Sequence, residues 1–580
     1  MDYQFASVQR RRRRRRRVTS IVALFLMIVT AAYVWMDKYW PNSERVNPDF
    51  GGVDKPIYYA GELQTSTALG KKEGLKLPLE LVQDLLDPNI VYEEASNSVI
   101  ITTKDKVIRL KTDVLTAMVN EKPLQLHVPV EQTASKQIYI PISPLETFYG
   151  VQIIESEETG VVRLIKQGDV LPWSAVSASA AGNDPSKPVP LRRGPSIKEP
   201  IVADATIGQR VLRWENQGEW ARIQLENGVT GYMKQAQLEE QDAETVPAPK
   251  TEESFEAWKP AAGSKINLIW EQVERKNPDT ATIPDMPGLN VISPTWFHLL
   301  DEEGNLKNNA DPEYVKWARD RGYQVWALFS NSFDPKMTSE ALSTYDKRIK
   351  MIKQLLAFAQ MYKLQGINID FENVYLKDKA KVTQFVRELT PLLHQQGLVV
   401  SMDVTPKSTN EQWSMFYDRK ALAESIDYMM VMTYDEHWAS SPKAGSVASL
   451  PWVESSITRI MKEDQVPSSK LLLGIPFYTR IWTETVKDGK TQVSSKAVTM
   501  PTVEGMIKNK GLKPQMDAAS GQQYVEYTEN GQTIKIWLEN ELSVKARAQL
   551  VNKYNLAGIA SWRRGYERPE IWDVLKDNLK

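Results

Sequence analysis

The sequence contains no cysteine and few histidines. Without cysteine among its 580 residues, the chain cannot form a disulfide, a thiolate zinc site, an iron–sulfur cluster or a cysteine nucleophile. The four histidines include no HExxH motif, which argues against a zinc enzyme of the histidine type. We therefore expect neither a metal nor an organic cofactor. The 17 tryptophans and 22 tyrosines suit another task, because exposed aromatic rings can serve as stacking platforms for sugars.

The chain also has little net charge, formally −1, but its charges are unevenly distributed. Its 72 Lys and Arg residues nearly balance its 73 Asp and Glu residues. Eight of the basic residues form one run, Arg10 to Arg17, and Asp2 is the only acidic residue before position 37. The remaining 544 positions carry 64 basic and 72 acidic side chains. A nucleic-acid partner is therefore not expected, since phosphate binding needs a basic face on the folded part.

One long apolar run follows the arginines. Residues 18–36 are uncharged over 19 positions, and at about 1.5 Å per residue they would span about 28 Å, close to the hydrocarbon thickness of a bilayer. By the positive-inside rule, the polybasic segment 1–17 stays in the cytoplasm and the rest lies outside. We expect a single-pass membrane anchor that holds the catalytic part on the cell-wall side. The alternative is a cleaved signal peptide, which Ala31 and Ala32 would permit.

The first module is expected after a linker at 37–53. Residues 54–168 show short β-runs around one helix, expected at 79–86. This pattern resembles, in fold alone, the small α+β module named for the copper amine oxidase N-terminal domain. No copper ligands are visible, because His127 stands alone.

The second module is expected at 188–240, between linkers at 169–187 and 241–262. It resembles a bacterial SH3-like domain in LRRGP at 191–195, GEWARI at 218–223 and NGVTGYM at 227–233. The Asn-Gly pair at 227–228 predicts a hairpin turn, in which both central residues favour positive φ. The resemblance implies contact with cell-wall peptide, and the alternative role is a spacer.

Strands and helices alternate from 263 to 580. Eight buried strands are predicted at 266–270, 289–297, 324–329, 365–371, 399–404, 428–434, 471–478 and 558–562. Amphipathic helices are predicted at 312–321, 339–362, 379–396, 451–462 and 543–554. The fold class is therefore α/β, with a C-terminal (β/α)8 TIM barrel. A hairpin around Asn530-Gly531 is expected as an insertion before the eighth strand.

The predicted fourth strand carries a row of polar side chains. Ile367, Ile369 and Phe371 alternate with Asn368, Asp370 and Glu372. With a period of two, the apolar set faces the surrounding helices and the polar set faces the barrel axis. Buried polar groups are costly unless they bond to one another, and Glu372 falls at the C-terminal strand end, where barrel enzymes place catalytic groups.

This strand resembles the DGxDxDxE motif of glycoside hydrolase family 18, the chitinase-like hydrolases. Three further motifs agree in order: MTYD at 432–435 resembles the sixth-strand MxYD, GIPFYTR at 474–480 resembles the seventh-strand motif, and Trp562 takes the eighth-strand tryptophan position. The NxDxE form, with TYDEHW at 433–438, is similar to the branch of spore-cortex and cell-wall N-acetylglucosaminidases.

The resemblance implies a substrate-assisted retaining mechanism, in which the 2-acetamido oxygen of the sugar attacks C1 and forms an oxazolinium ion. Glu372 would be the acid and base, Asp370 would orient the acetamido group, Tyr434 would hydrogen-bond its oxygen, and Asp435 would assist. The implied substrate-binding residues are Asn368, Met432, Trp562, Tyr478 and Arg480.

The chain departs from the family motif at several positions. Amides replace two acids, at Gln365 and Asn368, and the third-strand SxGG is reduced to FSNS at 329–332. A neutral Asn368 can hydrogen-bond Asp370 but cannot exchange a proton with it.

Three functional hypotheses follow. The first is a membrane-anchored hydrolase of β-linked N-acetylglucosamine bonds in peptidoglycan. The second is a catalytically silent sugar-binding barrel. The third keeps the enzyme but makes chitin or another N-acetylglucosamine polymer the substrate.

Overall fold

The computed structural model describes residues 2–181, 186–247 and 255–579. The chain divides into two compact units. The first comprises Met1–Pro88, Thr112–Leu115 and Gln125–Glu252, and the second comprises Asn89–Lys111, Thr116–Leu124 and Glu253–Lys580.

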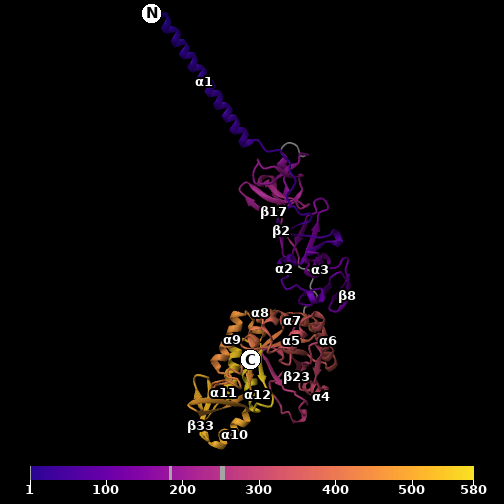
Figure 1. Cartoon of the computed structure of the whole chain (residues 1–580), viewed down its shortest axis with the longest axis vertical. Helices are drawn as coiled ribbons and strands as arrows, with labels where there is room; N and C mark the ends of the chain where they lie inside the picture. The colour runs from indigo at the N-terminus through magenta and orange to yellow at the C-terminus, as the bar shows by residue number, and fades with distance from the viewer. Residues whose placement is uncertain (1, 182–185, 248–254, 580) are drawn as a thin grey trace. The chain divides into compact units, whose positions relative to one another are not determined.

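The first unit begins with one continuous helix, α1 (Asp2–Tyr39), which contains the apolar run (Figure 1). In the part of the chain that the structure describes, Arg14–Tyr39 is the one helical stretch long and apolar enough to cross a membrane.

Two β-rich folds follow in the same unit. The first contains a sheet of order β11-β12-β1-β2, a second of order β3-β10-β9, and helices α2 and α3. The bounds are β1 Pro56–Tyr59, β2 Glu62–Thr67, β3 Lys76–Pro78, α2 Leu79–Leu85, β9 Glu131–Gln132, β10 Ile138–Pro141, α3 Ile142–Tyr149, β11 Gln152–Glu155 and β12 Val162–Ile165.

The second β-rich fold is a seven-stranded sheet of order β16-β15-β19-β18-β17-β14-β20. Its strands are β14 Trp173–Val176, β15 Val189–Arg192, β16 Ile201–Ala205, β17 Arg210–Gln217, β18 Trp220–Gln224, β19 Thr230–Lys234 and β20 Leu238–Glu240. Strand β14 comes from the segment predicted as a linker, and it pairs with both β17 and β20. At the Asn-Gly turn, positive φ occurs at Gly228 (88°) and not at Asn227. A short pair, β13 (Val170–Leu171) with β21 (Glu244–Thr245), completes the unit.

The second unit contains the barrel. Within residues 255–579, eight parallel strands pair in the order β22-β23-β25-β26-β27-β28-β29-β35, and β22 also pairs with β35, which closes the ring. Their bounds are β22 Ile266–Glu271, β23 Val291–Leu299, β25 Gln324–Ser330, β26 Gly366–Asp370, β27 Val399–Val404, β28 Tyr428–Met432, β29 Leu471–Pro476 and β35 Gly558–Trp562. The predicted TIM barrel is confirmed.

Helices surround this ring (Figure 1). They are α4 Pro312–Asp320, α5 Pro335–Ala341, α6 Tyr345–Tyr362, α7 Lys379–His394, α8 Arg419–Ser425, α9 Leu450–Glu463, α11 Glu541–Lys553 and α12 Glu570–Asn578. The single helix predicted at 339–362 was wrong, because Thr344 accepts a hydrogen bond from Lys347 and starts α6 as a separate helix. A short strand, β24 (Leu306–Asn308), pairs with the end of β23.

The insertion before the eighth strand is larger than a hairpin. The predicted hairpin is present as β33 (Gln522–Glu529) and β34 (Gln532–Trp537). It belongs to a five-stranded sheet with β30 (Tyr478–Lys487), β31 (Lys490–Thr499) and β32 (Gln515–Asp517), accompanied by α10 (Met500–Lys510). Because β30 and β31 are largely polar along their outer halves, their apolar pattern in the sequence is weak.

A five-stranded sheet from the N-terminal half also belongs to the second unit. Its strands are β4 Val91–Glu93, β5 Ser98–Thr102, β6 Val107–Lys111, β7 Thr116–Val119 and β8 Lys122–Gln125. Ile100 and Val107 are buried in the same hydrophobic cluster as the barrel helices. Arg348 of α6 forms ion pairs with Glu93 of β4 (2.9 Å) and with Glu388 of α7 (2.8 Å). This sheet therefore packs as part of the catalytic unit.

Candidate active site

Strand β26 presents its polar residues as the alternation predicts. Asn368 and Asp370 are buried at 0% and 8% exposure, and Glu372 follows the strand end in a half-buried position. The intervening Ile367, Ile369 and Phe371 lie in the hydrophobic cluster shared with the helices. The three polar side chains therefore occupy the axis side at the C-terminal face.

The main chain at Glu372 is clamped by side chains from two other segments. Asn331, directly after β25, accepts a hydrogen bond from the Glu372 N–H (3.1 Å) and donates one to the Glu372 carbonyl (2.8 Å). The hydroxyl of Tyr417 donates to the Phe371 carbonyl at 2.7 Å. Among the described residues, the carboxyl group of Glu372 itself makes no hydrogen bond, so it is available to a ligand.

Asn368 has different partners from those expected. Its oxygen accepts hydrogen bonds from Trp270 Nε1 (2.9 Å) and Ser293 Oγ (3.1 Å), and its Nδ2 donates to Asp403 Oδ1 at 3.0 Å. The expected hydrogen bond to Asp370 is not formed, because this buried amide is occupied by the neighbouring strands.

Asp370 faces a cleft with one oxygen unsatisfied. Within the described residues, its Oδ1 is buried without a hydrogen-bond partner. Asp370 and Trp562 both line an open cleft of about 680 Å³. The ring of Trp562 lies 6.1 Å from that of Trp270, centroid to centroid. A buried carboxylate oxygen without a partner is costly unless a ligand supplies a donor.

The environment of Glu372 favours its neutral form. Burial is the main cause that raises the pKa of its carboxyl group well above the ordinary value, and the charges of Asp370 and Asp435 add to it. A carboxylic acid that keeps its proton near neutral pH can act as a general acid.

The remaining predicted residues gather beyond β28 and β29. Tyr478 donates a hydrogen bond to Asp435 at 2.6 Å, and Arg480 forms an ion pair with the same carboxylate at 3.4 Å. The ring of Tyr434 lies 6.4 Å from that of Tyr478, and Met432 is buried at the end of β28. Burial raises the pKa of the Tyr434 phenol well above its usual value, so its hydroxyl stays a hydrogen-bond donor.

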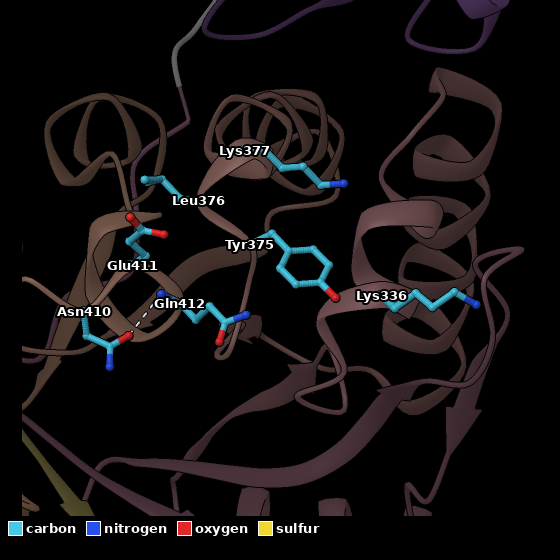
Figure 2. A pocket seen from close by; sticks show the side chains of 7 residues that line it. All are labelled: Lys336, Tyr375, Leu376, Lys377, Asn410, Glu411 and Gln412. Carbon is cyan, nitrogen blue, oxygen red and sulfur yellow. Dashed lines mark hydrogen bonds between the residues drawn. The ribbon is translucent and has the colours of Figure 1, made fainter.

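A second cleft of about 650 Å³ lies on the same face, formed by the loops after β25, β26 and β27 (Figure 2). Its lining residues are Lys336, Tyr375, Leu376, Lys377, Asn410, Glu411 and Gln412. Figure 2 shows the hydroxyl of Tyr375 directed toward the side that carries Lys336. Exposed Trp413 follows directly after this loop.

Sequence reasoning missed three residues of this centre: Asp403, Asn331 and Tyr417. Asp403 carried a usable signal as an acid in an apolar strand, and Asn331 carried one as part of FSNS at the third-strand motif position. In the part of the chain that the structure describes, no group of three or more His, Asp or Glu side chains is arranged to hold a metal ion.

Comparison with known proteins identifies the domain. Residues 298–567 match the glycosyl hydrolases family 18. This region belongs to family 18. The protein is therefore a glycoside hydrolase. Residues 63–164 match the copper amine oxidase N-terminal domain.

Several known proteins are similar to part of this chain. The uncharacterized glycosylase YvbX of Bacillus subtilis is 28% identical over 304 residues, covering 50% of this chain and 85% of YvbX. The cortical fragment-lytic enzyme of Bacillus subtilis is 25% identical over 256 residues, covering 43% of this chain and 58% of that enzyme. The solved spore cortex-lytic enzyme SleL of Bacillus megaterium is 19% identical, with a TM-score of 0.49, covering 64% of this chain and 89% of that chain.

Proposed function

We propose that this glycoside hydrolase is anchored in the cell membrane and cleaves β-linked N-acetylglucosamine bonds of peptidoglycan by a substrate-assisted retaining mechanism. The observation that carries the proposal is the unsatisfied Asp370 at the cleft that Trp562 also lines, two positions before Glu372, whose pKa is raised by burial. The acid supplies a proton, and the unsatisfied oxygen is suited to accept the N–H of an acetamido group.

In the first step, the acetamido carbonyl oxygen of the substrate attacks C1. Glu372 gives its proton to the glycosidic oxygen, which leaves with the bonding electron pair. Asp370 accepts a hydrogen bond from the acetamido N–H and stabilises the positive charge that develops on the oxazolinium ion. The Tyr434 hydroxyl donates to the acetamido oxygen and holds it below C1.

In the second step, the Glu372 carboxylate accepts a proton from water while the water oxygen bonds to C1. The bond from C1 to the acetamido oxygen breaks, and the acetamido group is restored. The acid has its proton again, and the anomeric configuration is retained. The nucleophile belongs to the substrate, so sugars without an N-acetyl group are not cleaved.

The two clefts support a polymer as the substrate. The cleft at Asp370 and Trp562 and the cleft at Tyr375 and Gln412 are both built from loops at the C-terminal strand ends. Peptidoglycan is favoured because one curated relative is named a cortical fragment-lytic enzyme.

The test compares wild type, E372Q and the matched surface variant E340Q on purified sacculi and colloidal chitin, with products identified by mass. We expect wild type and E340Q to release muropeptides with N-acetylglucosamine at the reducing end, and E372Q to lose at least 10³-fold of that activity, on the order of what one acid–base group contributes. Release of products from chitin alone would mean that chitin, and not peptidoglycan, is the substrate. Activity of E372Q equal to that of wild type would overturn the mechanism.

The anchor and the SH3-like module belong to the same proposal. Helix α1 supports the anchor by its length and hydropathy. Membrane fractionation of the full chain, with mass analysis of its N-terminus, separates an anchor from a signal peptide cleaved after Ala31 or Ala32. For the SH3-like module, we expect the E372Q protein to bind intact sacculi more tightly than amidase-treated sacculi that lack stem peptides. Equal binding would assign the module a spacer role.

A further inference from the structure

A small pocket in the first compact unit contains an arginine that the proposed mechanism does not use. The pocket has a volume of about 70 Å³ and is lined by residues of two sheets. From the first sheet, Arg163 of β12 lines it together with Tyr58 of β1, its neighbour in the parallel register. The second sheet contributes Leu212 and Trp214 of β17 and Gln224 of β18.

Contacts around the pocket hold the two sheets together. The hydroxyl of Tyr59 donates to Asp169 at 3.1 Å, and Arg222 of β18 donates to the Gly61 carbonyl at 2.7 Å. Trp214 packs so closely against Gly61 that a Cβ at position 61 would overlap the indole ring. The walls of the pocket are therefore fixed relative to one another.

Arg163 has no partner within the described part of the chain. It forms no hydrogen bond and no ion pair there, although it is half-buried on an otherwise apolar strand. Asp169, which also lines the pocket, is already engaged, because it accepts from Tyr59 and from the Lys166 N–H at 2.6 Å. Burial lowers the pKa of the Arg163 guanidinium, and the charge of Glu226 opposes this effect. A buried cation without a counter-charge is costly unless a ligand supplies one.

A second strand arginine shows the geometry that such a side chain adopts when it is paired. Arg109 lies in VIRLK of β6 much as Arg163 lies in VVRLI. Arg109 donates to both carboxylate oxygens of Asp346, at 2.6 and 3.1 Å. The same two-pronged arrangement is open to Arg163 if the carboxylate comes from outside the chain. A single guanidinium beside an acid suits a carboxylate with one charge better than a phosphate with nearly two.

The lining limits the size of the remainder of the ligand. Ile165, Leu171 and Leu212 place apolar side chains around the pocket, where they suit a methyl group. A volume of about 70 Å³ is that of about five water molecules, which admits a carboxylate with one or two further carbons and excludes a sugar ring. An alanine residue at the end of a peptide has these two groups.

We propose that this pocket binds the terminal carboxylate of an alanyl peptide, with the Arg163 guanidinium on the carboxylate and the alanine methyl group against Leu171 and Leu212. Peptidoglycan supplies such ends, because its stem peptides end in D-alanine. The identity of the ligand therefore rests on the proposed function. Binding here would keep the anchored enzyme on wall that still carries its stem peptides.

The first test titrates the full chain in detergent micelles with N-acetyl-D-alanyl-D-alanine and with its C-terminal amide, by calorimetry. We expect wild type to bind the acid, and to bind the amide about tenfold more weakly or less, because the amide has no charge. R163M should lose acid binding by about tenfold or more, and so should R163K, which keeps the charge but lacks the planar fork. The control R213M should bind like wild type, since Arg213 bonds Asn216 and Gln235 outside the pocket.

Hydrogen exchange of the same proteins tests a structural role for Arg163. Without ligand, β12 and β17 of R163M should exchange no faster than those of wild type, because no bond within the described chain is lost. The acid should slow exchange in these strands of wild type and not of R163M. Faster exchange in ligand-free R163M would assign Arg163 a packing role and overturn the proposal.

Equal affinity for the acid and the amide, equal affinity of wild type and R163M for the acid, or no binding at about 10 mM acid would also overturn it. Acetate that binds as tightly as the peptide would overturn the peptide as ligand. If R163M does not fold, R163K and the amide decide. Calorimetry needs no catalysis, so peptide binding without cleavage of any glycan would leave the pocket in place and refute only the proposed function.

Discussion

At the scale of single residues, Asn331, which directly follows β25, holds the main chain of Glu372, the proposed acid, in place. It is fully buried, and it also donates to Thr338 at 2.9 Å. A carboxyl group must reach the glycosidic oxygen within hydrogen-bond distance to transfer its proton. The Asn331 clamp therefore fixes the main chain from which the Glu372 side chain extends.

Substitution of Asn331 should reduce activity in steps. N331D keeps the acceptor for the Glu372 N–H and loses the donor to its carbonyl, whereas N331A loses both. We expect a loss in kcat on the order of 10²-fold for N331A and a smaller loss for N331D, because small misplacements of catalytic groups are costly. Steady-state kinetics with circular dichroism as the folding control measure this. Equal kcat for all three proteins would contradict the clamp.

The acid itself should make the fold less stable at alkaline pH. Because the folded-state pKa of Glu372 is raised, its protonated form contributes stability below about pH 4, and that contribution is lost as pH rises through the raised pKa. E372Q should therefore melt above wild type at pH 8 and close to it at pH 4. Melting curves from pH 4 to pH 8 measure this, with E340Q as the control. A difference in Tm between E372Q and wild type that does not grow with pH would contradict the prediction.

At the scale of elements, one buried arginine joins three of them. Arg348 of α6 is 3% exposed, and it pairs with Glu388 of α7 and Glu93 of β4. It also donates to the Leu342 carbonyl at 3.0 Å, just before α6 begins. The sheet β4–β8, helix α6 and helix α7 are thus linked by one charge network.

Breaking this network should strongly lower the free energy of unfolding of the catalytic unit. E388Q removes one of the two carboxylates that pair with the buried Arg348. R348M leaves both Glu388 and Glu93 without this cationic partner. We expect R348M to destabilise the catalytic unit by about 3–5 kcal/mol. The exposed i,i+4 pair Lys316–Asp320 on α4 is the control, and D320A should cost less than about 0.5 kcal/mol. Denaturant titrations compare the free energies of unfolding of R348M and D320A. Equal losses of stability in the two variants would refute the role of the buried network.

At the scale of the whole molecule, the sheet β4–β8 is separated from the barrel in sequence by more than a hundred residues, yet it shares its core. Strand β6 contacts α7, and Ile100 and Val107 lie in the barrel's hydrophobic cluster. The segment 63–164, which matches the copper amine oxidase N-terminal domain, therefore includes residues of both compact units.

I100A should weaken the barrel and not only the sheet. The substitution leaves a cavity, with an expected cost of about 2–5 kcal/mol. Hydrogen exchange should accelerate in α6 and α7 as well as in β5 and β6. The matched control is I201A, in β16 of the first compact unit, which should leave exchange in α6 and α7 unchanged. Faster exchange confined to β5 and β6 would contradict a shared core.

The sequence by itself determined the barrel and the polar row of strand β26, because both follow from local patterns along the chain. Alternation along Ile367 to Glu372 depends only on the geometry of one strand, and the four family motifs occur in order along the chain. Only the tertiary structure placed Asp403 against Asn368, and Asn331 and Tyr417 against the main chain of Glu372 and Phe371. These contacts join residues on separate strands and loops, so no local period encodes them. The same reason explains why the sheet β4–β8 was recognised as part of the catalytic unit only in three dimensions.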